Sequence, residues 1–227
     1  MFGVGHFRSR EDAGHQLCDH MPDIDPLSTV VVALPRGGVP VGAVIAERFR
    51  LPLDVLLIRK IGVPGHRELA LGAVSDGEKQ EITVNEDVAA ALRLDSDDIR
   101  ELAERELPEL ERRRQLFMRG RPPIPLNGKT VVLADDGVAT GATMRSAIRI
   151  VRQRQPEHII LALPVAPRST LAMLRPDVDE VVCLLQPEPF ISVGSYFSDF
   201  GQVDNLEVVD LLRRCNRNND NGGKGAA

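Results

Sequence analysis

The chain has 227 residues, of which 43% are hydrophobic and 27% charged, and its formal net charge at pH 7 is −5. This acidic balance argues against a nucleic-acid-binding surface, which is normally strongly basic. There is no apolar run of membrane-spanning length and no signal-peptide core, and the three cysteines have no metal-ligand or paired spacing, so we expect a cytoplasmic protein without membrane contact.

The first 85 residues alternate helical and extended patterns. Arg10–Asp19 is expected to form a short helix with Ser9 as its N-cap. Two buried strands, a helix between them and a hairpin across Asp76-Gly77 follow. In chain order these are strand Thr29–Leu34, helix Val41–Phe49, strand Leu53–Ile58 and the hairpin strands Leu69–Val74 and Glu81–Asn85.

A long charged helix is expected over Asp95–Arg119, capped by Asp95 or Ser96. Pro108 lies inside the pattern and predicts a kink or a break there. The apolar face of this segment is too extensive for a linker. We therefore expect the segment to support a homodimer or to pack against a mobile loop that follows Lys60.

A strand–helix alternation fills the second half and predicts an α/β fold with a parallel sheet flanked by helices. We expect a single domain over residues 1–214 with its core at about 29–200, and a disordered tail over residues 215–227. The alternating elements are Lys129–Ala134, Met144–Arg154, His158–Leu163, Arg168–Leu174 and Glu180–Leu185.

The stretch Val131–Thr143 carries the most specific signal. An apolar run ends in Asp135 and Asp136, and small and hydroxyl residues then lead into a helix. A parallel strand would deliver the two acids to the carboxyl edge of the sheet, and the turn would aim backbone N–H groups and hydroxyls at an anion. Carboxylates beside an anion cradle suit a ribose 5-phosphate. The alternative, a solvated turn with a threonine N-cap, leaves the glycine and alanine positions unexplained.

Other phosphate-binding motifs do not fit this stretch. A Walker A loop needs a lysine where Ala142 stands, and no G-x-G-x-x-G pattern is present. The stretch instead resembles the 5-phosphoribosyl 1-pyrophosphate (PRPP) signature of type I phosphoribosyltransferases. It also resembles a group of uncharacterised bacterial phosphoribosyltransferase-like proteins. The resemblance covers most of residues 29–200 and implies that family's fold, a parallel sheet flanked by helices with a small hood and a mobile loop.

The resemblance also implies roles for the residues of the signature. Asp135 and Asp136 would be the catalytic acids, which hold the ribose hydroxyls directly or through Mg²⁺. The 5-phosphate would lie on a loop of six residues. These are Val138, Ala139, Thr140, Gly141, Ala142 and Thr143.

A second glycine loop, Arg36-Gly37-Gly38, also lies between a strand and a helix. It resembles the pyrophosphate loop of the xanthine and guanine enzymes, which often holds a non-proline cis peptide; the alternative is an ordinary turn. Arg59 and Lys60 stand where several phosphoribosyltransferases place a basic pair against pyrophosphate, although a basic pair is more commonly plain surface charge.

The residues after Lys60 suit a mobile loop that closes over substrate. One departure from the family pattern concerns the base. At one position of the 5-phosphate loop, hypoxanthine–guanine enzymes carry an Asp that assists proton removal from the nucleobase. This chain has Ala139 there and in this respect resembles adenine and orotate enzymes. Glu68 in the loop is therefore the candidate general base, and Asp76 is the second candidate.

The acceptor pocket is expected in Glu188–Phe200, which resembles the base-holding segment of purine phosphoribosyltransferases. The lysine that reads purine oxo groups is missing from the region Leu163–Pro167. The sequence therefore does not identify the acceptor as a common purine. The candidate acceptor-binding residues are Phe190, Ile191, Tyr196 and Asp199.

The resemblance implies a Mg²⁺-dependent phosphoribosyltransferase of nucleotide metabolism, acting as a homodimer. It would transfer 5-phosphoribosyl from PRPP to a nucleobase-like or small nitrogen acceptor and release pyrophosphate. The alternative is a non-catalytic PRPP- or nucleotide-binding regulatory protein. Ala139 and the unassigned acceptor segment motivate that alternative.

Overall fold

The computed structural model describes residues 6–63, 66–76, 81–119 and 121–222. Its centre is a five-stranded sheet in the order β2-β1-β6-β7-β8, in which every neighbouring pair is parallel. The predicted α/β class with a parallel sheet flanked by helices is confirmed. The strands are β1 (Thr29–Ala33), β2 (Leu53–Val55), β6 (Thr130–Ala134), β7 (His158–Val165) and β8 (Glu180–Leu185).

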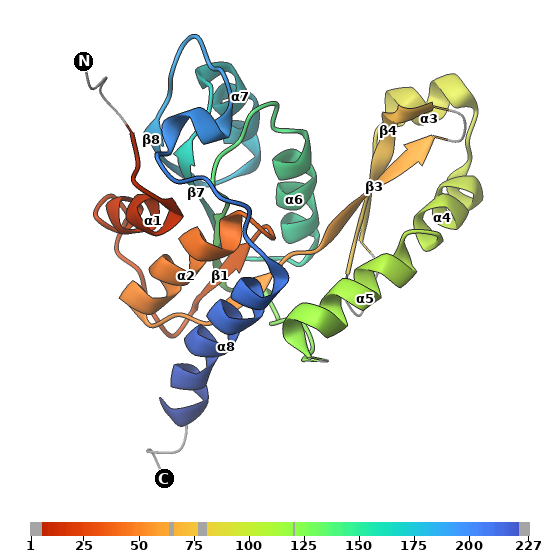
Figure 1. The fold of residues 1–227 in the computed structure, drawn as a ribbon. Helices are drawn as coiled ribbons and strands as arrows, with labels where there is room; N and C mark the ends of the chain where they lie inside the picture. Colours follow the sequence, from red (N-terminus) through yellow and green to blue (C-terminus); the bar gives the residue numbers. More distant parts are fainter. Residues whose placement is uncertain (1–5, 64–65, 77–80, 120, 223–227) are drawn as a thin grey trace.

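Helices cover both faces of this sheet (Figure 1). α1 (Arg10–Cys18), α2 (Gly38–Phe49) and α8 (Asn205–Gly222) pack on one face, and α6 (Ala142–Gln153) and α7 (Arg168–Leu174) pack on the other. The strands are apolar at nearly every position because successive side chains enter opposite cores. Within the described ranges no helix is long and apolar enough to cross a membrane.

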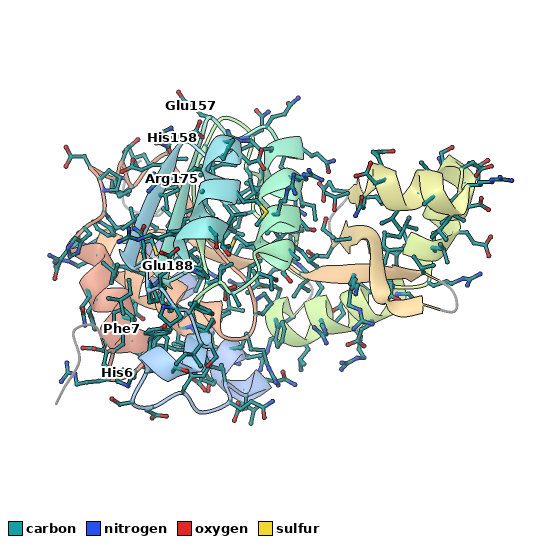
Figure 2. All side chains as sticks on the ribbon, turned by 90° about the horizontal axis from the view of Figure 1, so that it is seen from above. His6, Phe7, Glu157, His158, Arg175 and Glu188 are labelled. Atoms are coloured by element: carbon teal, nitrogen blue, oxygen red, sulfur yellow. The ribbon has the colours of Figure 1, made fainter. Side chains whose placement is uncertain are left out.

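A second, antiparallel sheet and three helices form an arm beside the parallel sheet (Figures 1 and 2). The predicted hairpin is confirmed, with Val74 opposite Ile82. The arm also contains a helix that the sequence did not predict, α3 (Glu86–Leu92). Its other elements are β3 (Ile58–Val63), β4 (His66–Ser75), β5 (Ile82–Val84), α4 (Ser96–Glu104) and α5 (Leu107–Met118).

The predicted strand Leu53–Ile58 is divided between the two sheets. β2 ends at Val55, and β3 begins at Ile58 in the antiparallel sheet. Leu56 and Leu57 connect them, and each is 1% exposed. Leu56 and Leu57 enter different hydrophobic clusters. This connection between the sheets is therefore as apolar as a buried strand, and its sequence pattern does not distinguish it from one.

The predicted helix Asp95–Arg119 is broken between Glu104 and Leu107. Pro108 lies in the first turn of α5, where its missing N–H is not needed. Asp95 caps α4 through a capping box. α4 contacts β3 and β4. Pro64 and Gly65 of the expected mobile loop lie outside the described residues, so packing against that loop stays a prediction, as does the homodimer.

The expected disordered tail from residue 215 onwards is wrong for residues 215–222, because α8 continues to Gly222. Cys215 is 4% exposed and Asn216 is 7% exposed. The Asn216 amide bonds both backbone groups of Leu53, accepting from its N–H at 3.1 Å and donating to its carbonyl at 2.9 Å. Asn216 thereby covers part of the edge strand β2, whose free backbone groups need partners. Residues 223–227 lie outside the described residues.

A buried ion network joins the arm to the parallel sheet. Arg114 of α5 is 6% exposed, and its Nη1 lies 2.9 Å from Asp76 Oδ2 and 3.4 Å from Asp54 Oδ1. Asp76 Oδ1 accepts a hydrogen bond from the N–H of Leu57 at 3.1 Å. Burial raises the pKa of Asp76, and the Arg114 charge opposes this shift. Asp76 is thus a structural group with both oxygens engaged and is not available as a general base.

Arg114→Ala should lower the free energy of unfolding by about 3–5 kcal/mol, because it leaves two buried carboxylates unpaired. Urea unfolding at pH 7 measures this change. The control is Arg105→Ala, which removes an exposed pair with Glu101 from the end of α4 and should cost less than about 1 kcal/mol. Equal losses for the two variants would contradict a structural role for the buried network.

Candidate active site

The loops after β1 and β6 meet at the switch point of the parallel sheet. The chain leaves β1 towards β2 at one edge of the sheet and leaves β6 towards β7 and β8 at the other. Because all five strands are parallel, their carboxyl ends lie at one side, and a crevice opens where the two directions of winding diverge. The Arg36–Gly38 loop and the Asp135–Thr143 loop are therefore neighbours.

These two loops approach so closely that only glycine fits. A Cβ atom on Gly38 would lie 2.7 Å from the Ala134 carbonyl oxygen and 2.8 Å from the Asp135 Cα, and one on Gly37 would collide with the Asp136 carboxylate. Gly37 has an ordinary φ of −61°, and a side chain there would have to displace the Asp136 carboxylate, whereas at Gly38 the obstacle is backbone. An ordinary turn would not need this contact. The peptide from Pro35 to Arg36 is cis, in keeping with the family resemblance.

The two acids are half-buried and lie in a polar arrangement. Asp135 Oδ1 accepts a hydrogen bond from the N–H of Asp136 at 2.9 Å, and Asp136 Oδ2 accepts one from Arg10 Nε at 2.7 Å. Burial and the neighbouring Asp136 charge raise the pKa of Asp135 well above its ordinary value. Burial also raises the pKa of Asp136, and the Arg10 guanidinium opposes that shift. Perturbed carboxyl groups in a crevice are typical of functional sites.

Arg10 is a site residue that the sequence reasoning missed. Its guanidinium carbon lies 3.8 Å from the centre of the Phe200 ring, and its Nη1 donates to the Gly201 carbonyl at 2.8 Å. One side chain therefore links α1, the acid pair and the segment after β8. Nothing in the local sequence indicates this role, because Arg10 reads only as the first residue of a short helix.

The predicted 5-phosphate loop forms an exposed turn at the start of α6. Gly141, with φ +79°, precedes the helix, and Gly137, with φ +154°, leaves room for Val165 and Val193. Val138 is buried, and its N–H donates to the Val165 carbonyl at 3.0 Å, so that N–H is already used. In the described part of the chain, no hydrogen bond uses the backbone N–H groups of residues 139–143. Such groups at a helix start suit an anion.

The basic pair on β3 faces this turn across a cavity of about 650 Å³. Lys60 and Thr143 both line the cavity, together with Arg113 of α5. Arg59 also lines it, and its Nη2 forms an ion pair with Glu106 at 2.7 Å. The described structure thus brings the pair to the anion cradle, although Arg59 is partly engaged in holding the arm.

The candidate acceptor residues gather in the hood after β8. The Phe190 and Tyr196 rings stack on each other with centroids 5.7 Å apart. Ile191 is 79% exposed, and the exposed Asp199 accepts from the N–H of Gly201 at 3.1 Å. Their binding roles stay predictions.

The amino-terminal segment packs against this hood. The N–H of Phe7 donates to the Tyr196 carbonyl at 2.8 Å. In Figure 2, Phe7 lies towards the opposite end of the molecule from His158, which begins β7, and Glu188 lies between them. The hood therefore stands at the carboxyl side of the sheet. Pro64, Gly65 and the Glu68 side chain lie outside the described residues, so the general-base prediction for Glu68 stays open to test.

The acid pair fits a Mg²⁺ ion that is shared with a substrate. Among the described residues, no cluster of three or more His, Cys, Asp or Glu could hold a metal by itself. Magnesium, however, often uses only one or two carboxylates, with waters and substrate phosphates completing its shell. One oxygen of Asp135 and one of Asp136 take part in none of the hydrogen bonds of the described residues. These two atoms are the available ligands.

The chain is similar to several known proteins in sequence and in fold. The family model described as phosphoribosyl transferase domain matches residues 19–197. Two curated proteins from Mycobacterium tuberculosis strains, each named "Putative phosphoribosyl transferase", are 41% identical over 211 residues, or 93% of this chain and 47% of their own length. The chain spans about half the length of these relatives. A crystal structure of a Thermus thermophilus protein is 38% identical with a TM-score of 0.80, covering 92% of this chain and 98% of its own.

Asp135→Asn should stabilise the metal-free protein at pH 7. Because the folded-state pKa of Asp135 is raised, its ionisation opposes folding increasingly as pH rises from the unfolded value through the folded one. Asparagine removes that charge and keeps an acceptor for the Asp136 N–H. Urea unfolding should show a gain of about 1–2 kcal/mol at pH 7 that disappears below about pH 4. A loss of stability that is equal at both pH values would contradict this interpretation.

Proposed function

The chain belongs to the phosphoribosyl transferase domain family, and from this premise we propose that it is a Mg²⁺-dependent phosphoribosyltransferase that transfers 5-phosphoribosyl from PRPP and releases pyrophosphate. The acceptor is a nucleobase-like or other small nitrogen compound. The observation that carries the proposal is the glycine-only contact between the Arg36–Gly38 loop and the Asp135–Asp136 pair. It supports a site in which a half-buried carboxylate pair lies between a basic loop and an anion cradle.

Each part of PRPP has a group of residues suited to it. The backbone N–H groups of residues 139–143 and the Thr143 hydroxyl receive the 5-phosphate. Asp135 and Asp136 accept hydrogen bonds from the ribose hydroxyls and hold the metal. Gly37, Gly38 and the Arg36 guanidinium receive pyrophosphate, with Lys60 reaching from β3.

The chemistry breaks the bond from ribose C1 to pyrophosphate while positive charge builds on the sugar ring. The protein stabilises that charge with carboxylates that are fixed before the substrate arrives. Arg10 holds Asp136 in place by a 2.7 Å bond, and the Asp136 N–H holds Asp135. Bound magnesium would supply neutralisation of the charge on the departing pyrophosphate.

The acceptor side of the proposal rests on the hood and on Glu68. Phe190 and Tyr196 offer ring faces, Ile191 offers an exposed apolar group, and Asp199 offers a carboxylate. Glu68 would take a proton from the nitrogen acceptor. A homodimer in the cytoplasm completes this proposal, and light scattering tests the oligomeric part: a monomer at working concentrations would exclude the dimer.

The second candidate function is a non-catalytic PRPP- or nucleotide-binding regulatory protein. The burial of Asp76 and its bonds to Arg114 and to the Leu57 N–H favour this function, because they remove one of the two candidate general bases. Calorimetry with PRPP and Mg²⁺ beside a pyrophosphate-release screen over nitrogen acceptors separates the two functions. Tight binding without turnover for any acceptor supports the regulatory protein, and an absence of binding contradicts both.

Asp136→Asn and Asp135→Asn should each lower PRPP-dependent turnover by about 10²–10³, the range for loss of one preorganised electrostatic contact. Both variants should keep the fold, which circular dichroism checks. Steady-state pyrophosphate release measures the effect. Wild-type turnover in both variants would overturn the assignment of the acid pair.

Thr143→Val should weaken PRPP binding about tenfold, because it removes a hydroxyl from the cradle while keeping the side-chain volume. Calorimetry with PRPP and Mg²⁺ measures the affinity. Arg145→Gln is the matched control on the same helix, since Arg145 lies beyond the turn and does not line the cavity shared by Thr143 and Lys60. An equal loss in both variants would mean that the hydroxyl has no specific role.

A further inference from the structure

A second cavity, of about 460 Å³, opens beside the Arg36 loop. Three parts of the chain line it: the loop after β1, the middle of α5 and the first residue of α8. No role in the site was assigned to α5 from the sequence, so its contribution was not expected. The lining residues that matter are Arg36, Arg112, Arg113 and Asn205.

The cavity wall carries an excess of positive charge. Arg112 Nε and Arg113 Nε both donate to the Glu109 carboxylate, each at 2.8 Å. These two bonds lower the pKa of Glu109 to about 2, so it is ionised at neutral pH. The Arg36 guanidinium makes no hydrogen bond or ion pair within the described ranges. Two guanidinium groups thus share one carboxylate and a third has no carboxylate partner in the described residues, so the net positive charge of the wall favours a bound anion.

The geometry also connects this cavity to the substrate crevice. Arg113 lines both the 460 Å³ cavity and the 650 Å³ cavity that contains Lys60 and Thr143. The neighbouring residue Arg114 is fixed by the buried ion network with Asp54 and Asp76. This face of α5 is therefore held in place between the anion cradle and the pyrophosphate loop.

We propose that Arg112 and Arg113 of α5 bind the pyrophosphate group of PRPP together with Arg36. This inference rests on the proposed function. With the ribose held at Asp135 and Asp136, the pyrophosphate on its C1 atom would lie on the side of Gly37. The 460 Å³ cavity opens at the loop that contains Gly37. Guanidinium groups bind phosphate oxygens through two parallel hydrogen bonds, which suits a polyanion with several terminal oxygens. Helix α5 would thus select a donor that carries pyrophosphate.

The first test is calorimetry with magnesium pyrophosphate and, separately, with ribose 5-phosphate. Arg112→Gln/Arg113→Gln should bind pyrophosphate about 10–100-fold more weakly and ribose 5-phosphate as wild type does. Arg105→Gln is the matched control, because Arg105 pairs with a glutamate in the same way at the exposed end of α4. It should leave both affinities unchanged.

Glu109→Gln gives a second test that a loss of folding cannot imitate. This variant releases both arginines from their carboxylate, so pyrophosphate affinity should rise several-fold. Wild-type pyrophosphate affinity in both the double variant and Glu109→Gln would overturn the inference and leave the proposed function standing. Failure of the wild-type protein to bind either pyrophosphate or ribose 5-phosphate would overturn the proposed function itself.

Discussion

The contact between the loops after β1 and β6 is the constraint on which the site depends. Gly37 and Gly38 leave no room for a side chain between themselves and Asp135 and Asp136. The closeness that creates the crevice also takes the two acids partly out of solvent, and this desolvation raises their pKa values. Arg10 offsets part of that electrostatic penalty from another element of the fold. The site therefore contains two carboxylates whose charges are unfavourable for folding, as is common where structure serves binding or catalysis.

A second constraint couples the arm to the parallel sheet. Arg114 lies on α5, Asp54 on β2 and Asp76 directly after β4, and they meet where all three side chains are buried. Buried ion pairs give little net stability but penalise any arrangement that separates the partners. The network thus fixes how α5 approaches the crevice. That placement brings Arg113 to the wall of both cavities.

Local patterns accounted for most of the elements and for the loops of the site. Continuous apolar runs indicated the parallel strands, and Asp95 and Pro108 indicated the ends of the helices in the arm. The errors fall where tertiary contacts outweigh local pattern. The polar residues from Cys215 onwards looked unable to pack, yet Asn216 covers the backbone of β2. Asp76 looked like an exposed turn acid until Arg114, 38 residues away, was placed beside it.

The sequence by itself determined the α/β class, the family, and the two loops that carry Arg36–Gly38 and Asp135–Thr143. These follow from short-range patterns, because a strand end, a glycine turn and a helix start are encoded within a few residues. Only the tertiary structure decided which distant groups complete the site. Arg10 and Arg113 reach it because the sheet order and the buried network bring α1 and α5 to its edge. Contacts between residues so far apart leave no periodic trace in a single sequence.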